Sequence, residues 1–459
     1  MRMRDSPTAL PSAMHRDIAR SSIPSVRSGA VTVRDLFAAS LIAADPTSFT
    51  ARAVRLRLPS DRSAAKPTWI IALGKASLTM ARAALHEMRE RNATLRGGLI
   101  VCASPVESPH PDIAVVAGDH PVPGERSLAA SGALASLCVR VEDGDRVFVL
   151  LSGGASSLIA APVESVTPAD LIVLCELLLH SGLDIGRVNT VRKRFLRWGA
   201  GRLAAALAPA RIELIVLSDV IGDNLAHIGS GPCVPDPTNA VDVRLLLDEA
   251  HLVDRTPRAL LQYLDEVMRG DRPETPKSDA PAFLFTGVPA VQGNGGVLDA
   301  GALRARVLGF DPVVIVNEPL QGEARTAGVR LANAAMALPR GGVAFWGGET
   351  TVTIEGDAPP GGRCQEMMLA AAIELSNVGA GASGITVLAA GTDGRDGPTD
   401  AAGAIVDAAT VPRVVESGLV PSDALRRHES YEALNRAGAL LKTGMTGTNL
   451  GDVVIAVRT

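Results

Sequence analysis

The chain has 459 residues, of which 47% are hydrophobic and 20% charged, and its formal net charge is −4. That length is enough for two or three domains and a sizeable core, and the charge balance lacks the basic character of a nucleic-acid-binding domain. Its apolar runs are shorter than the roughly 20 residues that a membrane helix needs. We therefore expect small-molecule partners, with neither nucleic acid nor membrane.

The N-terminal segment, residues 1–32, is rich in Arg, Ser and Pro and lacks the apolar stretch of a secretory signal. It predicts a disordered tail. The five cysteines show no metal-ligand spacing, and their odd number favours reduced thiols and a cytoplasmic setting. They are Cys102, Cys138, Cys175, Cys233 and Cys364.

Apolar runs of strand length repeatedly end in Gly, Ser or Asp, and helix-period residues follow them. The runs are 69–73, 147–151, 214–217, 343–346 and 385–390. This alternation predicts an α/β fold with largely parallel sheets, whose ligands gather at the carboxyl ends of the strands. The polar, Pro-rich segment 268–282 predicts a linker between an N-terminal domain, 33–267, and a C-terminal domain, 283–459.

A Gly- and Ser-rich loop follows the second of these strand segments and precedes a predicted helix. Its residues are Ser152, Gly153, Gly154, Ala155 and Ser156. Backbone N–H groups at a helix start bind anions, and paired glycines let a phosphate or carboxylate approach closely. The alternative is a tight turn with a Ser cap.

Lys75 follows Gly74 directly at the end of the first strand segment, and it is one of only five lysines among 45 basic residues. The segment does not match a P-loop. Because the positive end of a helix disfavours a cation, Lys75 at this position indicates an ammonium group that faces an anion. Nearby, the loop 118–123 contains the pair Asp119 and His120, which fits a rigid turn or an acid/base pair equally well.

Two acidic loops and one arginine complete the candidate site. Asp219 ends a strand segment and Asp393 lies in a Gly- and Asp-rich loop, so both could hold Mg²⁺ beside phosphate oxygens; ordinary Asp-Gly turns are the alternative. Arg363 stands at a Gly-rich helix start, where it could clamp a transferring phosphoryl group, although a plain surface arginine would look the same. The loop 446–449 fits ligand contact and turn chemistry equally.

The sequence 379–384 matches GxGxxG, but it precedes a strand segment and so fails the context test for a dinucleotide site. This disfavours a nicotinamide enzyme.

Taken in order, these motifs resemble the class II glycerate kinases, the MOFRL family, whose members are also labelled hydroxypyruvate reductases. The segments that carry the resemblance include 74–76, 118–121, 151–157, 188–193, 217–223, 347–350, 361–366, 391–397 and 446–449. The resemblance implies a Rossmann-like N-terminal domain, a MOFRL-like C-terminal domain and an active site in the cleft between them.

The resemblance also implies the reaction, an ATP- and Mg²⁺-dependent phosphorylation of the 2-hydroxyl of D-glycerate to 2-phospho-D-glycerate, and a homodimer as one assembly. The family's catalytic Lys and Arg correspond to Lys75 and Arg363, with Asp219 as a third catalytic candidate. Its motifs add a set of substrate- or phosphate-binding candidates, namely Asn189, Arg192, Glu349 and Thr392.

Three positions depart from the family pattern within the motifs around Lys193 and Arg363, and Met445 replaces the Pro that usually precedes Thr446. Cys364 replaces an expected Asn, Leu196 an expected Ser and Gly199 an expected Lys, and the segment 276–300 matches poorly. These departures keep three alternatives open: a kinase of another small hydroxy acid, an NAD(P)H-dependent hydroxypyruvate reductase and a binding protein without catalysis.

Overall fold

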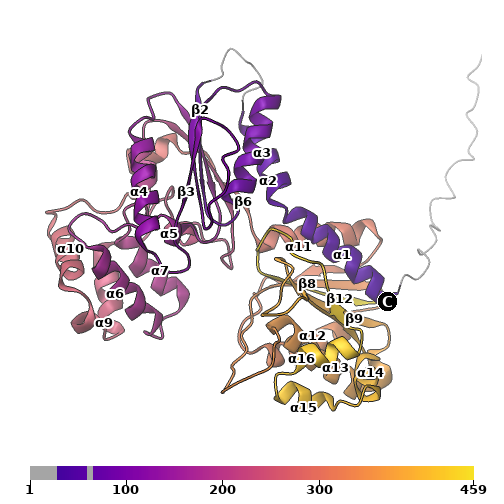
Figure 1. Cartoon of the computed structure of the whole chain (residues 1–459). Helices are drawn as coiled ribbons and strands as arrows, with labels where there is room; N and C mark the ends of the chain where they lie inside the picture. The colour runs from indigo at the N-terminus through magenta and orange to yellow at the C-terminus, as the bar shows by residue number, and fades with distance from the viewer. Residues whose placement is uncertain (1–27, 59–65) are drawn as a thin grey trace, which may run out of the picture.

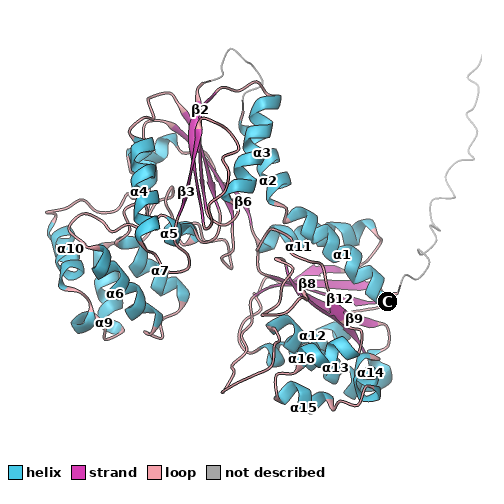
Figure 2. Cartoon of the chain, viewed as in Figure 1, coloured by secondary structure: helices cyan, strands magenta, loops and turns pink. Residues whose placement is uncertain are grey.

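The computed structural model describes residues 28–58 and 66–459, which fold into two α/β domains (Figures 1 and 2). Of the expected tail, residues 1–27 lie outside the described part, whereas residues 29–32 begin a helix. Within the described ranges, no helix is long and apolar enough to cross a membrane. The predicted α/β class with two domains is confirmed.

The first domain contains a six-stranded parallel sheet in the order β3-β2-β1-β4-β5-β6. Its strands are β1 (Thr68–Leu73), β2 (Leu95–Cys102), β3 (Ile113–Ala117), β4 (Arg146–Leu151), β5 (Arg211–Leu217) and β6 (Ala290–Gln292). Every residue of β1 is buried, because helices cover both faces of a parallel sheet. The strand order reverses between β1 and β4, which is where doubly wound folds bind ligands.

Helices cover this sheet on both faces and add a separate layer. On one face lie α2 (Pro46–Arg57) and α3 (Ser77–Glu90), and on the other α4 (Glu125–Cys138), α5 (Ala155–Leu158) and α8 (Arg202–Leu207). Four further helices form a helical layer with its own hydrophobic core, at the lower left of Figure 1. They are α6 (Pro168–Leu179), α7 (Ile185–Arg194), α9 (Ala240–Glu249) and α10 (Arg258–Arg269).

The second domain contains a six-stranded mixed sheet in the order β11-β10-β9-β12-β8-β7. Its strands are β7 (Val313–Ile315), β8 (Gly342–Gly348), β9 (Ile385–Gly391), β10 (Gly403–Asp407), β11 (Leu440–Leu441) and β12 (Asp452–Arg458). Only β7 and β8 pair in parallel, so this sheet is not largely parallel as expected. The connection 392–402 contains no helix, and a parallel pairing of β9 with β10 would need a longer crossover.

Helices also cover both faces of the mixed sheet. One face carries α1 (Gly29–Ala43) and α11 (Asn294–Val307), and the other α12 (Ala324–Ala337) and α13 (Arg363–Val378). Three short helices pack against α13, namely α14 (Thr410–Glu416), α15 (Pro421–Arg426) and α16 (Ser430–Arg436).

The domain boundaries differ from the predicted ones. Helix α1 packs on α11, β9 and β12 of the second domain, where Asp35 forms an ion pair with Arg304 at 2.8 Å. The chain therefore crosses between the domains twice, at residues 44–45 and after β6. The predicted linker 268–282 is packed into the first domain, because Thr275 is only 2% exposed and donates a hydrogen bond to buried Asp236 at 2.9 Å.

Candidate active site

The loops that follow β1 and β4 are joined at their bases by hydrogen bonds. Ser152 Oγ accepts from the backbone N–H of Ala76 at 3.0 Å, and the N–H of Lys75 donates to the carbonyl of Gly153 at 3.0 Å. Gly74 has a φ of +120°, and a Cβ there would overlap Ser152. The glycine before Lys75 is thus required by this close approach of the two loops.

The paired glycines of the β4 loop bring three functional side chains together. A Cβ on Gly153 would overlap the Asp219 carboxylate, and one on Gly154 would lie 3.0 Å from His120 Nε2 and 3.4 Å from Lys75 Cε. Lys75, His120 and Asp219 therefore surround the same pair of glycines. The helix that follows, α5, has a single turn and ends at Leu158.

The charges of this cluster are partly uncompensated. Lys75 is exposed to the cleft, and its ammonium group has no hydrogen bond or ion pair with any described residue. The walls of the cleft raise the pKa of Asp219 through desolvation, although Lys75 and His120 oppose this. Desolvation and the charge of Lys75 lower the pKa of His120. The cluster thus combines an unpaired ammonium group, an imidazole with decreased proton affinity and a carboxylate with increased proton affinity.

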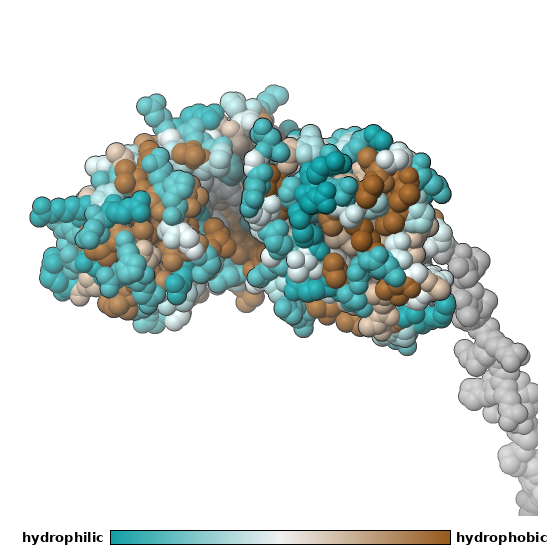
Figure 3. All heavy atoms as spheres, turned by 90° about the horizontal axis from the view of Figure 1, so that it is seen from below, coloured by the Kyte–Doolittle hydropathy of each residue, from teal (hydrophilic) through white to brown (hydrophobic). Residues whose placement is uncertain are grey.

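Three cavities adjoin one another along the cleft between the domains, which Figure 3 shows from below. The first cavity, about 620 Å³, includes Gly154, Asn189 and Asp219 in its walls. The bridging cavity, about 240 Å³, has Asp219 from one domain and Glu349 from the other. The second-domain cavity, about 840 Å³, includes Glu349 and Arg363. Asp219 lines both the first and the bridging cavity, and Glu349 lines both the bridging and the second-domain cavity, so the three cavities are immediate neighbours.

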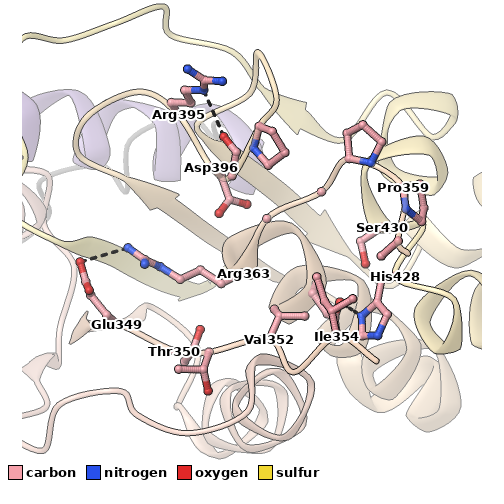
Figure 4. A pocket seen from close by; sticks show the side chains of 18 of the residues that line it. Glu349, Thr350, Val352, Ile354, Pro359, Arg363, Arg395, Asp396, His428 and Ser430 are labelled. Carbon is pink, nitrogen blue, oxygen red and sulfur yellow. Dashed lines mark hydrogen bonds and ion pairs between the residues drawn. The ribbon is translucent and has the colours of Figure 1, made fainter. Parts of the chain in front are cut away.

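Arg363 begins α13 and points toward Glu349 in the second-domain cavity (Figure 4). Its Nε and Nη2 donate to both carboxylate oxygens of buried Asp452 at 2.6 and 2.9 Å, and Nη2 also donates to Glu349 at 3.1 Å. Burial opposes ionisation, but these carboxylates raise the pKa of Arg363 above its usual value. The guanidinium is fixed in place, and its Nη1 has no partner among the described residues.

Asp396 caps the helix that carries Arg363. Its carboxylate accepts from the backbone N–H groups of Cys364 at 3.2 Å and Gln365 at 2.8 Å. Burial raises the pKa of Asp396 to about 7 despite these bonds. A Cβ on Gly362 would overlap this carboxylate, which explains the glycine before Arg363.

The remaining predicted residues fall into two groups. Asn189 and Arg192 line the first cavity, where Arg192 Nη2 donates to Asn189 Oδ1 at 2.7 Å, and Ser156 lines it as well. Asp393 lines the second-domain cavity, so the structure does not bring it to Asp219. Thr392 is fully buried, and its hydroxyl group donates to Gly451 O and accepts from Leu450 N, both at 2.8 Å. It lines none of the three cavities.

The three departures from the family pattern around Lys193 and Arg363 have different surroundings. Leu196 lines the first cavity, where it adds apolar surface. Cys364 is fully buried beneath Arg363 and lines none of the three cavities. At Gly199, a Cβ would lie 3.0 Å from the Lys193 carbonyl oxygen, so a lysine there would need the backbone to move.

For two residues of the candidate site the sequence alone does not decide a role. The loop that contains His120 fits a turn and an acid/base pair equally well; its neighbour Asp119 has a structural role, because it accepts from the N–H groups of Arg126 and Ser127 at the start of α4. No sequence motif marks Asp452 as part of the site, because its partner Arg363 lies far away in the sequence.

Residues 32–265 match the family described as "Domain of unknown function (DUF4147)", and residues 342–452 match the MOFRL family. A glycerate 2-kinase of Pyrococcus horikoshii is 38% identical over 401 residues, which are 85% of this chain and 87% of the relative. A D-glycerate 2-kinase of Thermotoga maritima is 36% identical over 89% of this chain and 94% of its own length. A protein of Agrobacterium vitis named as a hydroxypyruvate reductase is 36% identical over 84% of this chain and 97% of its own length.

The crystal structure of a glycerate kinase from Thermotoga maritima has the same fold, with a TM-score of 0.81 and 32% identity over 94% of this chain and 99% of that one. The matches cover both domains and extend along nearly the whole chain. The chain therefore belongs to the glycerate 2-kinase family with DUF4147 and MOFRL domains.

Proposed function

We propose that this protein is a glycerate 2-kinase, which transfers the γ-phosphoryl group of ATP to the 2-hydroxyl of D-glycerate and releases ADP and 2-phospho-D-glycerate. The main support is the row of neighbouring cavities lined by Asp219 of one domain and by Glu349 and Arg363 of the other, with Lys75 beside Gly154 at the wall of the first cavity. The names of the relatives from Pyrococcus and Thermotoga support the same reaction.

The proposed mechanism uses each group for one task. Asp219 accepts the proton of the 2-hydroxyl while the hydroxyl oxygen bonds to the γ-phosphorus and the bond to the β–γ bridging oxygen breaks. Its raised pKa suits a general base. Lys75 and the free Nη1 of Arg363 stabilise the charge on the transferred group. Phosphoryl transfer depends mainly on such positioning and charge stabilisation.

We propose Glu349 and Asp393 as the residues that would hold Mg²⁺, with Asp219 kept for proton transfer. Both line the second-domain cavity, and each keeps one carboxylate oxygen without a hydrogen bond to a described residue. Mg²⁺ commonly binds one or two carboxylates together with phosphate oxygens, so this donor set fits. When bound, the ion would neutralise charge on the phosphate oxygens.

The reductase alternative has weaker support. The GxGxxG segment 379–384 lies at the 3-10 helix η5 (Gly379–Ala382), between α13 and β9, and does not follow a strand as a nicotinamide site requires.

One assay separates the two reactions. Purified protein is given D-glycerate with ATP and Mg²⁺, and separately hydroxypyruvate with NADH. We expect ADP release and a product phosphorylated at carbon 2; NADH oxidation without ADP release would refute the proposal.

We propose a cytoplasmic setting for this reaction. All five cysteines are free and four are buried, and burial raises the pKa of Cys138 to about 12. These features suit a reducing compartment. Cell fractionation would test the setting, and the homodimer stays a prediction that sedimentation would check.

A further inference from the structure

The first cavity is mostly apolar, although it opens beside the charged cluster of Lys75 and Asp219. Two helix faces form its walls. On α7, Ile185, Val188, Asn189 and Arg192 share one face at helical spacing. The facing residues of α6 are mostly apolar, namely Leu171, Ile172, Cys175, Leu178 and Leu179, with Glu176 as the one carboxylate, which forms no ion pair with Arg192. The cavity thus runs from a polar end at Gly154 to an apolar end between α6 and α7.

Arg192 is a cation in this cavity without a counter-ion. Its guanidinium donates to the neutral amide of Asn189 but forms no ion pair with a carboxylate among the described residues. Its buried Nε has no hydrogen-bond partner within residues 28–58 and 66–459, and desolvation lowers the pKa of Arg192. Burying an unpaired charge and an unpaired donor is costly, so the arrangement favours an anionic ligand.

The two proposed substrates differ in what they could bury here. Every carbon of glycerate carries oxygen, so glycerate has no apolar surface to match the walls of α6 and α7. Adenine has two broad apolar ring faces. At about 620 Å³ the cavity lies within the range of about 300–1,000 Å³ typical of pockets that bury larger ligands.

We propose that the first cavity holds the nucleotide, with the adenosine group between α6 and α7 and the triphosphate extending past Arg192 to the Gly153–Gly154 loop and Lys75. The acceptor then reaches Asp219 from the second domain. This inference rests on the proposed kinase function. It adds an assignment of the substrates, with the nucleotide bound by the first domain and the acceptor by the second.

Two further observations agree with this assignment. The loops after β1 and β4 lie where the strand order of the sheet reverses, the position at which doubly wound sheets bind nucleotides. At the other end of the cavity, Leu179 and Ile185 are 75% and 70% exposed. Their clustered apolar surface is what a purine ring would cover.

Leu179 and Ile185 form the exposed rim of the first cavity, and charged substitutions there test the proposal without disturbing the core. Leu179→Asp and Ile185→Asp place a carboxylate where the base would lie. We expect each to raise the Kd of ATP and its KM about tenfold or more, because the carboxylate must lose hydration beside the ring. The KM of D-glycerate should change less than about twofold. Val173→Asp is the matched control, since Val173 is an exposed apolar residue of α6 that lies outside the cavity.

Equilibrium dialysis with labelled ATP, without acceptor, separates this proposal from the kinase function. ATP binding that is weakened by Ile185→Asp but not by Val173→Asp would support the nucleotide site even if no phosphoryl transfer occurs. If the rim variants instead raise the KM of the acceptor and leave ATP binding unchanged, the cavity holds the acceptor and the proposal is wrong. Equal binding of ATP by all variants would also overturn it.

Discussion

Asp219 of the first domain and Glu349 of the second line one small cavity, and the charge of Asp219 contributes to the raised pKa of Glu349 across the cleft. Burial raises the pKa of Glu349, Arg363 opposes this, and the nearby charges of Asp452 and Asp219 raise it further. The two carboxylates come from different domains; Asp219 also lines the first cavity and Glu349 also lines the second-domain cavity. Their separation therefore reports directly how far the cleft is open.

The first prediction concerns Asp219 as the proton acceptor. Asp219→Asn should lower kcat by about 10²–10⁴-fold, the usual contribution of a general base, with little change in Tm. In the wild type, activity should rise with pH through a pKa above the ordinary value of 3.8 for Asp, because the carboxylate must be ionised to act. The variant should lack this limb of the pH–rate profile. An exposed carboxylate, changed in Asp112→Asn, provides the control.

The second prediction concerns Mg²⁺. Glu349→Gln should increase the Mg²⁺ concentration needed for half-maximal rate at saturating ATP, because an amide oxygen binds the ion more weakly than a carboxylate. High Mg²⁺ should restore part of the rate. Glu355→Gln, on the exposed loop that follows β8, is the control. An unchanged Mg²⁺ dependence would remove Glu349 from the metal site.

The third prediction concerns the free ammonium group. Lys75→Ala should reduce kcat by about 10²–10³-fold, comparable with the loss of one donor to a developing charge. Lys75→Arg should not restore the rate, since a planar guanidinium cannot replace a compact ammonium on a side chain whose Cε lies 3.4 Å from where a Cβ of Gly154 would be. Steady-state kinetics with unchanged circular dichroism would check both. Full activity of Lys75→Ala would exclude the role.

The fourth prediction concerns the pair of Arg363 and Asp452. Arg363→Lys breaks the two-point contact between the guanidinium and the Asp452 carboxylate. The Asp452 side chain, which is only 3% exposed, then keeps a single and weaker partner. Because Arg363 itself is 34% exposed, we expect a loss of about 2 kcal/mol in the free energy of unfolding, less than for a fully buried pair. Urea unfolding would measure it. The double variant with Asp452→Asn should be less destabilised than the sum of the single variants.

The fifth prediction concerns Asp396 at the start of α13. Its pKa is about 7 in the folded protein, against 3.8 as the ordinary value. Between those two pH values the unfolded chain releases a proton that the folded protein still holds, so this group's contribution to stability is greatest below pH 4 and is lost as pH rises to about 7. Each unit of difference represents about 1.4 kcal/mol.

The variant Asp396→Asn cannot titrate, so the decline of Tm between about pH 4 and 7 should be shallower than in the wild type. Differential scanning calorimetry over this pH range would show the difference. Parallel curves for the two proteins would contradict the raised pKa.

Local patterns were enough to predict much of the site. Lys75, Asp219 and the Ser152–Ser156 loop all follow apolar strands, and parallel strands bring their carboxyl ends to one edge, so sequence position alone placed them together. The pairing of Arg363 with Asp452 could not be predicted in this way. Those residues meet only because β12 inserts between β8 and β9.

Long-range packing also decided the domain boundaries. The composition of α1 does not indicate which sheet it covers, and the polar residues of 268–282 gave no sign that Thr275 would be buried. Similarly, His120 joins the site through a contact with Gly154, which no spacing in the sequence encodes.

The two crossings of the chain between the domains, near Asp45 and Gly293, have a mechanical consequence. A single connection would let one domain swivel freely about the other. Two connections restrict the domains to rotation about a hinge axis, which is the line that passes through both connections. Any closure of the cleft would then follow one path and bring Lys75 and Arg363 toward the same relative alignment each time.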